Sequence, residues 1–151
     1  MRTKQLLALI ATAAFAGGAL AADSATVGVS ASVVGVCKYS TATGSVSFTL
    51  NPATGGPVGG TLSQPAFWCT KGATYTISDD NGANESGSTH RMKHATLAEY
   101  IPYTFSYTAT GTGSGKGTTI PMDIAASVLE SDYINASEGS YADTVTLSIT
   151  P

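Results

Sequence analysis

Two histidines have a spacing that could hold a metal ion. His90 and His94 stand four residues apart, like the zinc ligands of an HExxH motif, in which a glutamate beside the first histidine acts as general base. Here Arg91 occupies the position of that glutamate. We therefore predict two surface histidines and no metal site.

A glycine-rich segment, residues 111–117, resembles a phosphate-binding loop only in part. Gly115 and Lys116 match the GK of the pattern GxxxxGK[ST]. However, Thr110 replaces the first glycine of the pattern, and Gly117 replaces the hydroxyl residue that would hold magnesium. The segment is predicted to be a flexible hairpin tip, without a nucleotide.

The acidic cluster of Asp79, Asp80 and Asn81 before Gly82 lacks the ligand spacing and the terminal glutamate of a calcium loop, so we predict a turn there. No serine lies in a GxSxG nucleophile elbow, and no nucleophile can be paired with a base. The sequence predicts no enzyme activity and no cofactor.

The N-terminus is typical of an export signal. Arg2 and Lys4 precede an apolar stretch at residues 6–16, and an AxA-type cleavage site ends at Ala21. We predict a signal peptide over residues 1–21 that is removed by cleavage. A membrane anchor is the alternative, but the apolar stretch is short for one.

Export would bring Cys37 and Cys69, the two cysteines of the chain, into an oxidising compartment. An oxidising compartment favours a disulfide, and two cysteines allow one pairing. A reactive or metal-binding thiol pair is the alternative, although the spacing does not resemble CxxC.

The composition narrows the possible partners. The chain has 151 residues, of which 11% are charged, and a net charge of −3. Loss of Arg2 and Lys4 makes the mature chain more acidic still. This balance argues against nucleic acid and anionic membranes as partners. No apolar run beyond the N-terminus is long enough for membrane insertion.

Apolar residues alternate with small polar ones along most of the mature chain, which is typical of half-buried strands. The alternating runs include residues 27–33, 46–50, 75–77, 103–107 and 145–149. Turn-forming clusters separate them, and the best helix candidate is residues 93–100. We predict an all-β chain folded as an antiparallel sandwich.

The two ends of the mature chain resemble the spore coat protein U domain family, whose members include pilins of archaic chaperone–usher pili. The most specific part is the C-terminal pattern GxYxDTVxLxI, carried by Tyr141, Asp143, Val145, Leu147 and Ile149. The segment before Cys37 and the order of the cysteines are similar as well.

This resemblance implies an incomplete immunoglobulin-like antiparallel β-sandwich that is completed by a donor strand from a neighbouring subunit. A periplasmic chaperone would fill the open groove first, and an outer-membrane usher would then join identical or related pilin subunits head to tail. The expected product is a cell-surface pilus, reached by secretion through the periplasm, that supports adhesion or biofilm formation.

The implied domains are the signal peptide at residues 1–21, an N-terminal arm that donates a strand at residues 22–35, and the sandwich at residues 36–151. Gly35 would be the swivel between arm and sandwich. The side chains that would insert into a neighbouring groove lie on one face of the arm: Val27, Val29, Ala31 and Val33.

Two questions stay open at this stage. The arm could instead be the first strand of its own sheet, in a stand-alone secreted or coat-associated domain that binds a surface ligand. Aromatic residues of the strands could line such a ligand site or belong to the core: Trp68, Tyr100, Tyr103 and Tyr107.

Overall fold

The computed structural model describes residues 22–151. The predicted signal peptide, residues 1–21, lies outside the described residues. The chain divides into two compact parts between Ser32 and Val33. No helix within residues 22–151 has the length and apolar character needed to cross a membrane.

The described section of the first part, residues 22–32, belongs to no ladder of hydrogen-bonded strands. Every residue in it is exposed, and Val27 and Val29 keep 85% and 91% of their surface accessible. Val33, at the start of the second part, is 85% exposed. The alternation of apolar and small polar residues therefore lies in a segment that pairs with no strand of the described chain.

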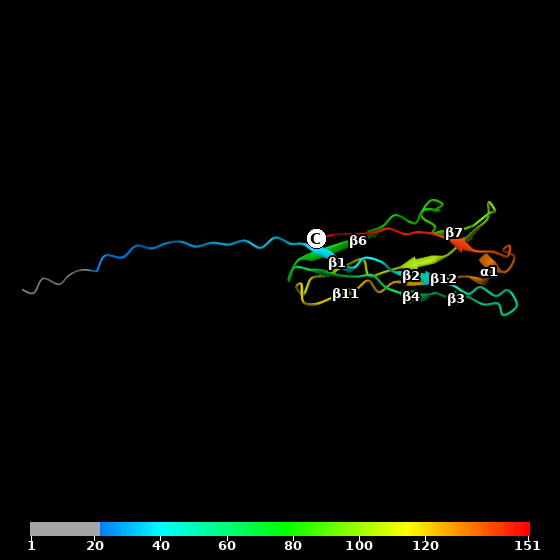
Figure 1. Cartoon of the computed structure of the whole chain (residues 1–151), viewed down its shortest axis with the longest axis horizontal. Helices are drawn as coiled ribbons and strands as arrows, with labels where there is room; N and C mark the ends of the chain where they lie inside the picture. The colour runs from blue at the N-terminus through cyan, green and yellow to red at the C-terminus, as the bar shows by residue number, and fades with distance from the viewer. Residues whose placement is uncertain (1–21) are drawn as a thin grey trace, which may run out of the picture. The chain divides into compact units, whose positions relative to one another are not determined.

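Residues 33–151 fold into antiparallel strands arranged in two layers (Figure 1). In the first layer, β5 lies between β1 and β11, β12 lies between β3 and β9, and β2 pairs with β4. Their bounds are β1 (Cys37–Thr41), β2 (Ser45–Ser47), β3 (Val58–Gly59), β4 (Thr61–Ser63), β5 (Ala66–Cys69), β9 (Thr104–Ser106), β11 (Ile120–Pro121) and β12 (Ala125–Val128).

In the second layer, β6 lies between β10 and β14, and β7 lies between β8 and β13. Their bounds are β6 (Thr74–Asp79), β7 (Arg91–His94), β8 (Tyr100–Pro102), β10 (Thr110–Thr112), β13 (Tyr141–Ala142) and β14 (Leu147–Thr150). The predicted all-β sandwich is confirmed.

Two apolar clusters form the core between the layers. In the first, the ring of Phe67 from β5 packs edge-on against that of Tyr75 from β6, with centroids 4.9 Å apart. The second cluster surrounds Ile101, Val128 and Tyr133. Alternate residues of β6 are buried and exposed, as strands with one face on a core require.

The predicted disulfide is present: Cys37 of β1 is bonded to Cys69 of β5, the residue directly opposite it in the ladder. Immediately before β1, the hydroxyl of Thr70 accepts a hydrogen bond from the N–H of Val36 and donates one to the carbonyl of Val34. These bonds hold the segment before β1 to the residue that follows β5.

The best helix candidate of the sequence, residues 93–100, is not a helix in the structure. This segment is the end of β7, a turn and the start of β8, in which Lys93 pairs with Tyr100. Tertiary pairing overrides the weak local preference for helix. The described chain does contain a four-residue helix that the sequence did not predict, α1 (Glu130–Tyr133), and its Tyr133 is buried and donates to the carbonyl of Gly56.

Candidate functional site

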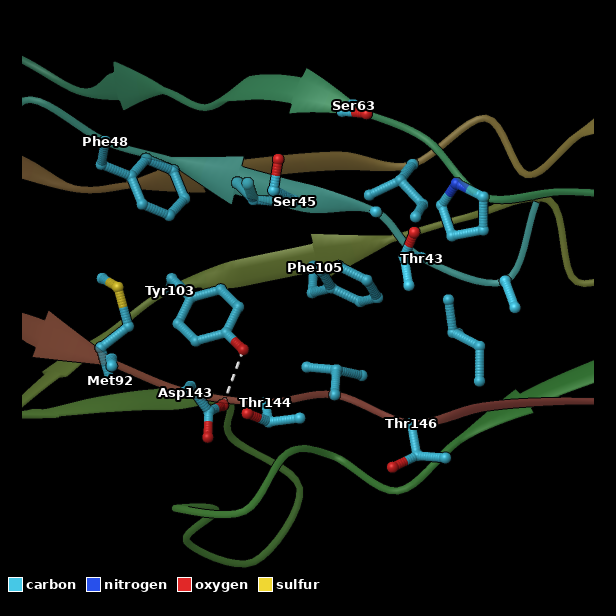
Figure 2. Close-up of a pocket in the computed structure, with 18 of the residues that line it drawn as sticks. Thr43, Ser45, Phe48, Ser63, Met92, Tyr103, Phe105, Asp143, Thr144 and Thr146 are labelled. Carbon is cyan, nitrogen blue, oxygen red and sulfur yellow. Dashed lines mark hydrogen bonds between the residues drawn. The ribbon is translucent and has the colours of Figure 1, made fainter.

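The main surface feature is a groove along the side where the two layers face each other with unpaired edges. Its cavity volume is about 660 Å³. One wall is formed by β1, β2 and the residues between them, and the other by the C-terminal segment from Tyr141 to Leu147. We call it the open groove. Figure 2 shows Tyr103 and Phe105 lying between these walls.

The C-terminal wall has a free edge. Among residues 22–151, β14 pairs only with β6. Ile77 of β6 stands opposite Ile149 of β14. The N–H of Ile77 points away from β14, because it donates to the carbonyl of Ala109 on the β10 side. Ile77 and Ile149 therefore exchange no hydrogen bonds with each other. Because backbone groups alternate in direction along a strand, the N–H and C=O groups of Ile149 and Leu147 both point away from β6, toward the free edge.

The same alternation extends into the residues before β14. The N–H of Thr146 donates to Asp80, and the carbonyl of Thr144 accepts from Ala83, so these residues turn toward the loop at 80–84. Val145 lies between them and faces the other way. The wall therefore presents main-chain donors and acceptors to the groove, which is what an added strand needs.

Five side chains form the floor of the groove. Those of Phe48, Met92, Tyr103 and Phe105 are large, and Ile124 completes the set. Phe48, Tyr103 and Phe105 are only half-buried, although they pack against the core clusters. Apolar side chains that remain half-exposed offer surface that an inserted apolar side chain could cover.

Asp143 ties the floor to the wall. Its Oδ2 accepts a hydrogen bond of 2.7 Å from the Tyr103 hydroxyl, drawn as a dashed line in Figure 2, and its Oδ1 accepts from the backbone and side-chain amides of Asn84. Burial, followed by this contact with Asp143, raises the pKa of Tyr103 well above its usual value. Tyr103 therefore stays a neutral donor.

The loop at 79–84 forms the turn that the sequence predicts. Asp79 and Asp80 each accept a bond from the backbone N–H two residues further along. Asp80 also accepts from the backbone of Thr146, and this bond lowers the pKa of Asp80 most. Gly82 has a φ of 87°, and a Cβ there would collide with Asp143, so the turn requires glycine.

The structure brings the C-terminal pattern together on one face. Tyr141, Asp143, Val145, Leu147 and Ile149 are all half-buried, and the residues between them are exposed. Four of the five line the open groove, and Ile149 packs on the core beyond it. These placements agree with the alternation in the sequence.

A second hollow of about 610 Å³ adjoins the open groove. The two share Val46, Phe48, Met92 and Tyr141 in their linings. The second hollow continues between the chain at 50–52 and the segment at 136–140. The groove therefore extends past β2 in this direction.

The prediction of two surface histidines is wrong, since His90 is 8% exposed and His94 6%. Nδ1 of His94 accepts the N–H groups of Thr96 and Leu97, so its Nε2 donates to the carbonyl of Glu138. This bonding organises the turn between β7 and β8 and one border of the second hollow.

His90 packs against the rings of Tyr103 and Phe105, with centroids 5.4 and 5.3 Å apart. Its Nε2 lies 3.8 Å from a carboxylate oxygen of Asp79 and has no hydrogen-bond partner. Within residues 22–151, no three side chains of metal-ligating type cluster together.

The aromatic residues of the alternative ligand site do not form one site. Tyr103 lies in the open groove and Tyr107 packs on the core, whereas Tyr100 is stacked under Arg91 and Trp68 lies near Lys116.

Comparison with known proteins gives one family. The model of the Spore Coat Protein U domain matches residues 23–148. A search of curated proteins gave no match.

Among solved structures, one match is the crystal structure of the CsuC–CsuE chaperone–tip adhesion subunit pre-assembly complex from archaic chaperone–usher Csu pili of Acinetobacter baumannii. The sequence identity is 17% and the TM-score 0.45, and the alignment covers 78% of this chain. The chain spans 40% of the length of that solved chain.

Proposed function

Since the chain belongs to the spore coat protein U domain family, we propose that it is a structural subunit of an extracellular chaperone–usher pilus. Subunits polymerise by donor-strand exchange: the N-terminal arm of one copy, residues 22–35, fills the open groove of the next. The observation that carries this proposal is the free edge of β14 bordering an apolar groove, in a chain that also has an exposed, alternating arm.

The arm and the groove match in length. The inserting residues run from Val27 to Val33, and the C-terminal wall runs from Tyr141 to Leu147, so each is about seven residues long. At ~3.3 Å per residue, an extended strand of this length covers roughly 20 Å.

They also match in chemistry. Burying a valine side chain contributes about 1.5 kcal/mol, so Val27, Val29 and Val33 together contribute on the order of 4 kcal/mol, and each new main-chain hydrogen bond adds about 1 kcal/mol. The free N–H and C=O groups of Val145 are among those that supply these bonds.

A donor strand has to be supplied to each new subunit before a neighbour arrives, because the groove leaves core residues half-exposed. We assign this role to a periplasmic chaperone and the exchange step to an outer-membrane usher. The product is a cell-surface pilus that supports adhesion or biofilm formation, and the chain itself performs no catalysis.

The test is gel electrophoresis in SDS, with and without boiling, of protein from cells that express the native secretion locus. We expect a ladder of multimers that collapses on boiling. The ladder should disappear when Val29 and Val33 are both replaced by Asp, because charged side chains cannot enter the apolar groove.

The matched control replaces Ser30 and Ser32 by Asp, which adds the same charge to the opposite face of the arm. This variant should keep the ladder. A lone monomer in the native background, with secretion verified, would contradict the proposal and favour the stand-alone domain that binds a surface ligand.

A further inference from the structure

One contact crosses the open groove from wall to wall. The hydroxyl of Tyr39, on β1, donates a hydrogen bond of 2.8 Å to the backbone carbonyl of Leu147, on β14. Some residues of β1 and β14 have Cα atoms within 8 Å of each other. Tyr39 and Leu147 line the groove, whereas Cys37 and Ile149, two residues further along each wall, do not. The contact therefore lies at one end of the groove.

The bond occupies a group that an incoming strand would use. The carbonyl of Leu147 points to the free edge of β14, as the pairing of Ile77 with Ile149 requires. With the Tyr39 hydroxyl bound to it, this acceptor is satisfied inside the subunit. The N–H and C=O groups of Val145 have no such side-chain partner among the described residues.

Tyr39 is held firmly on its own side. Its ring packs edge-on against the buried ring of Phe67, with centroids 6.5 Å apart. The disulfide from Cys37 to Cys69 fastens the start of β1 to β5. Burial raises the pKa of the Tyr39 hydroxyl, which keeps it a neutral donor.

The opposite end of the groove is different. There it continues into the second hollow, bordered by Pro52 and the segment at 136–140. An inserted strand could therefore slide along the groove in that direction. Any slip must be by two residues, because a one-residue slip would turn the valines away from the floor.

We propose that Tyr39 is the register stop of the open groove: by capping the Leu147 carbonyl, it ends strand pairing at Val145 and sets how deeply an arm can slide toward that end of the groove. This inference rests on the proposed function, since it concerns the same arm in the same groove. It assigns a positioning role to a residue outside the C-terminal pattern and outside the arm.

The test maps the register by disulfide cross-linking in polymers of the full chain. Thr144→Cys, on the exposed face of the wall, is combined in turn with a cysteine at each outward-facing arm position, 26, 28, 30 and 32. Directly opposite residues have Cα atoms about 5 Å apart, within disulfide reach. A two-residue slip moves the partner about 7 Å along the strand, which places the two Cα atoms about 8 Å apart, beyond that reach.

With Tyr39 present, we expect one arm position to dominate the cross-linked dimers. Tyr39→Phe keeps the ring on Phe67 but frees the carbonyl, so a strand can slip two residues deeper and bond to it. The ratio between the dominant position and its neighbour should fall by about fivefold, which corresponds to about 1 kcal/mol. Tyr107→Phe is the matched control, since Tyr107 packs in the same core cluster and does not line the groove.

An unchanged ratio in Tyr39→Phe would overturn the register stop and leave donor-strand exchange standing. A ratio that falls equally in Tyr107→Phe would also overturn it, because the effect would then be one of general stability. No cross-link from any arm position in the native background would overturn donor-strand exchange itself, and the SDS ladder distinguishes that failure.

Discussion

The hydroxyl of Tyr103 and the carboxylate of Asp143 are joined by a hydrogen bond of 2.7 Å that connects the floor of the open groove to its C-terminal wall. Tyr103 follows β8 and Asp143 follows β13, and no direct ladder connects their segments. The groove keeps its width here because a polar contact, and not a paired strand, sets the distance between floor and wall.

Replacing Asp143 by Ala should destabilise the sandwich by about 2–4 kcal/mol. The change leaves the Tyr103 hydroxyl and the backbone N–H of Asn84 without their acceptor, and bonds to a charged group are the stronger kind. Urea denaturation measures the loss. Asp23→Ala, which removes the same charge from the exposed arm, should leave the urea midpoint unchanged.

The stability should fall at alkaline pH. The folded state raises the pKa of Tyr103, so it holds the phenolic proton more tightly than the unfolded chain does. This contribution is complete below the unfolded pKa of about 10 and is lost as the pH rises further. Urea midpoints from pH 8 to 11 should decline less steeply in Tyr103→Phe. A slope that does not change would contradict the assignment, and some slope should remain because burial also raises the pKa of Tyr39 and Tyr107.

Removing the disulfide should lower the free energy of unfolding by about 3–4 kcal/mol, the value of the chain-entropy model for a loop with a sequence separation of 32. Comparing urea curves of the native chain with and without reductant gives this number. The double variant Cys37→Ala, Cys69→Ala should match the reduced protein and be insensitive to reductant. A loss under 1 kcal/mol would indicate that the unfolded chain is already constrained.

His94→Ala should cost about 2–3 kcal/mol, since it strips three backbone groups of their partner in a buried position. Thermal unfolding would show the effect, with Lys93→Ala, an exposed neighbour on the same strand, as control. Equal melting temperatures for the two variants would argue against a structural role for the imidazole.

Arm and groove variants should complement each other. Val145→Asp places a charge in the groove and should abolish acceptance of an arm, while its own arm stays intact. The arm variant Val29→Asp, Val33→Asp has the opposite defect. Each alone should give monomers, and co-expression should restore dimers but no longer multimers, seen as one SDS-resistant band. A full ladder on co-expression would contradict donation by the arm.

The strands at both ends of the sandwich could be predicted because their alternation is local. The strands at residues 45–47 and 147–150 overlap the predicted runs at 46–50 and 145–149, and Cys37 and Cys69 form the predicted disulfide. The even spacing of His90 and His94 misled the prediction, because four residues separate neighbours on a helix face and also residues on one face of a strand.

The hydrogen bonds around the groove could not be predicted from the sequence, because they join residues far apart in the chain. Tyr39 and Leu147 are 108 residues apart, and Asn84 and Asp143 are 59 apart, so nothing in the local pattern links them. The sequence singled out Asp143 only through the C-terminal pattern, and no signal marked Tyr39. The alternation at residues 46–50 included Phe48, but it did not indicate that this side chain lines a groove. Tertiary packing alone decides which aromatic side chains remain half-covered.

The free edge of β14 also has a consequence for the lone subunit. An unpaired row of backbone N–H and C=O groups is a template for indiscriminate strand pairing, which is how many β-proteins aggregate. The rim of the groove carries small polar residues such as Thr43, Ser45 and Thr144, but no lysine and no proline blocks the β14 edge itself. We expect the isolated subunit to aggregate as its concentration rises. The strand edge that makes assembly possible therefore also limits how long a subunit stays in solution without a partner strand.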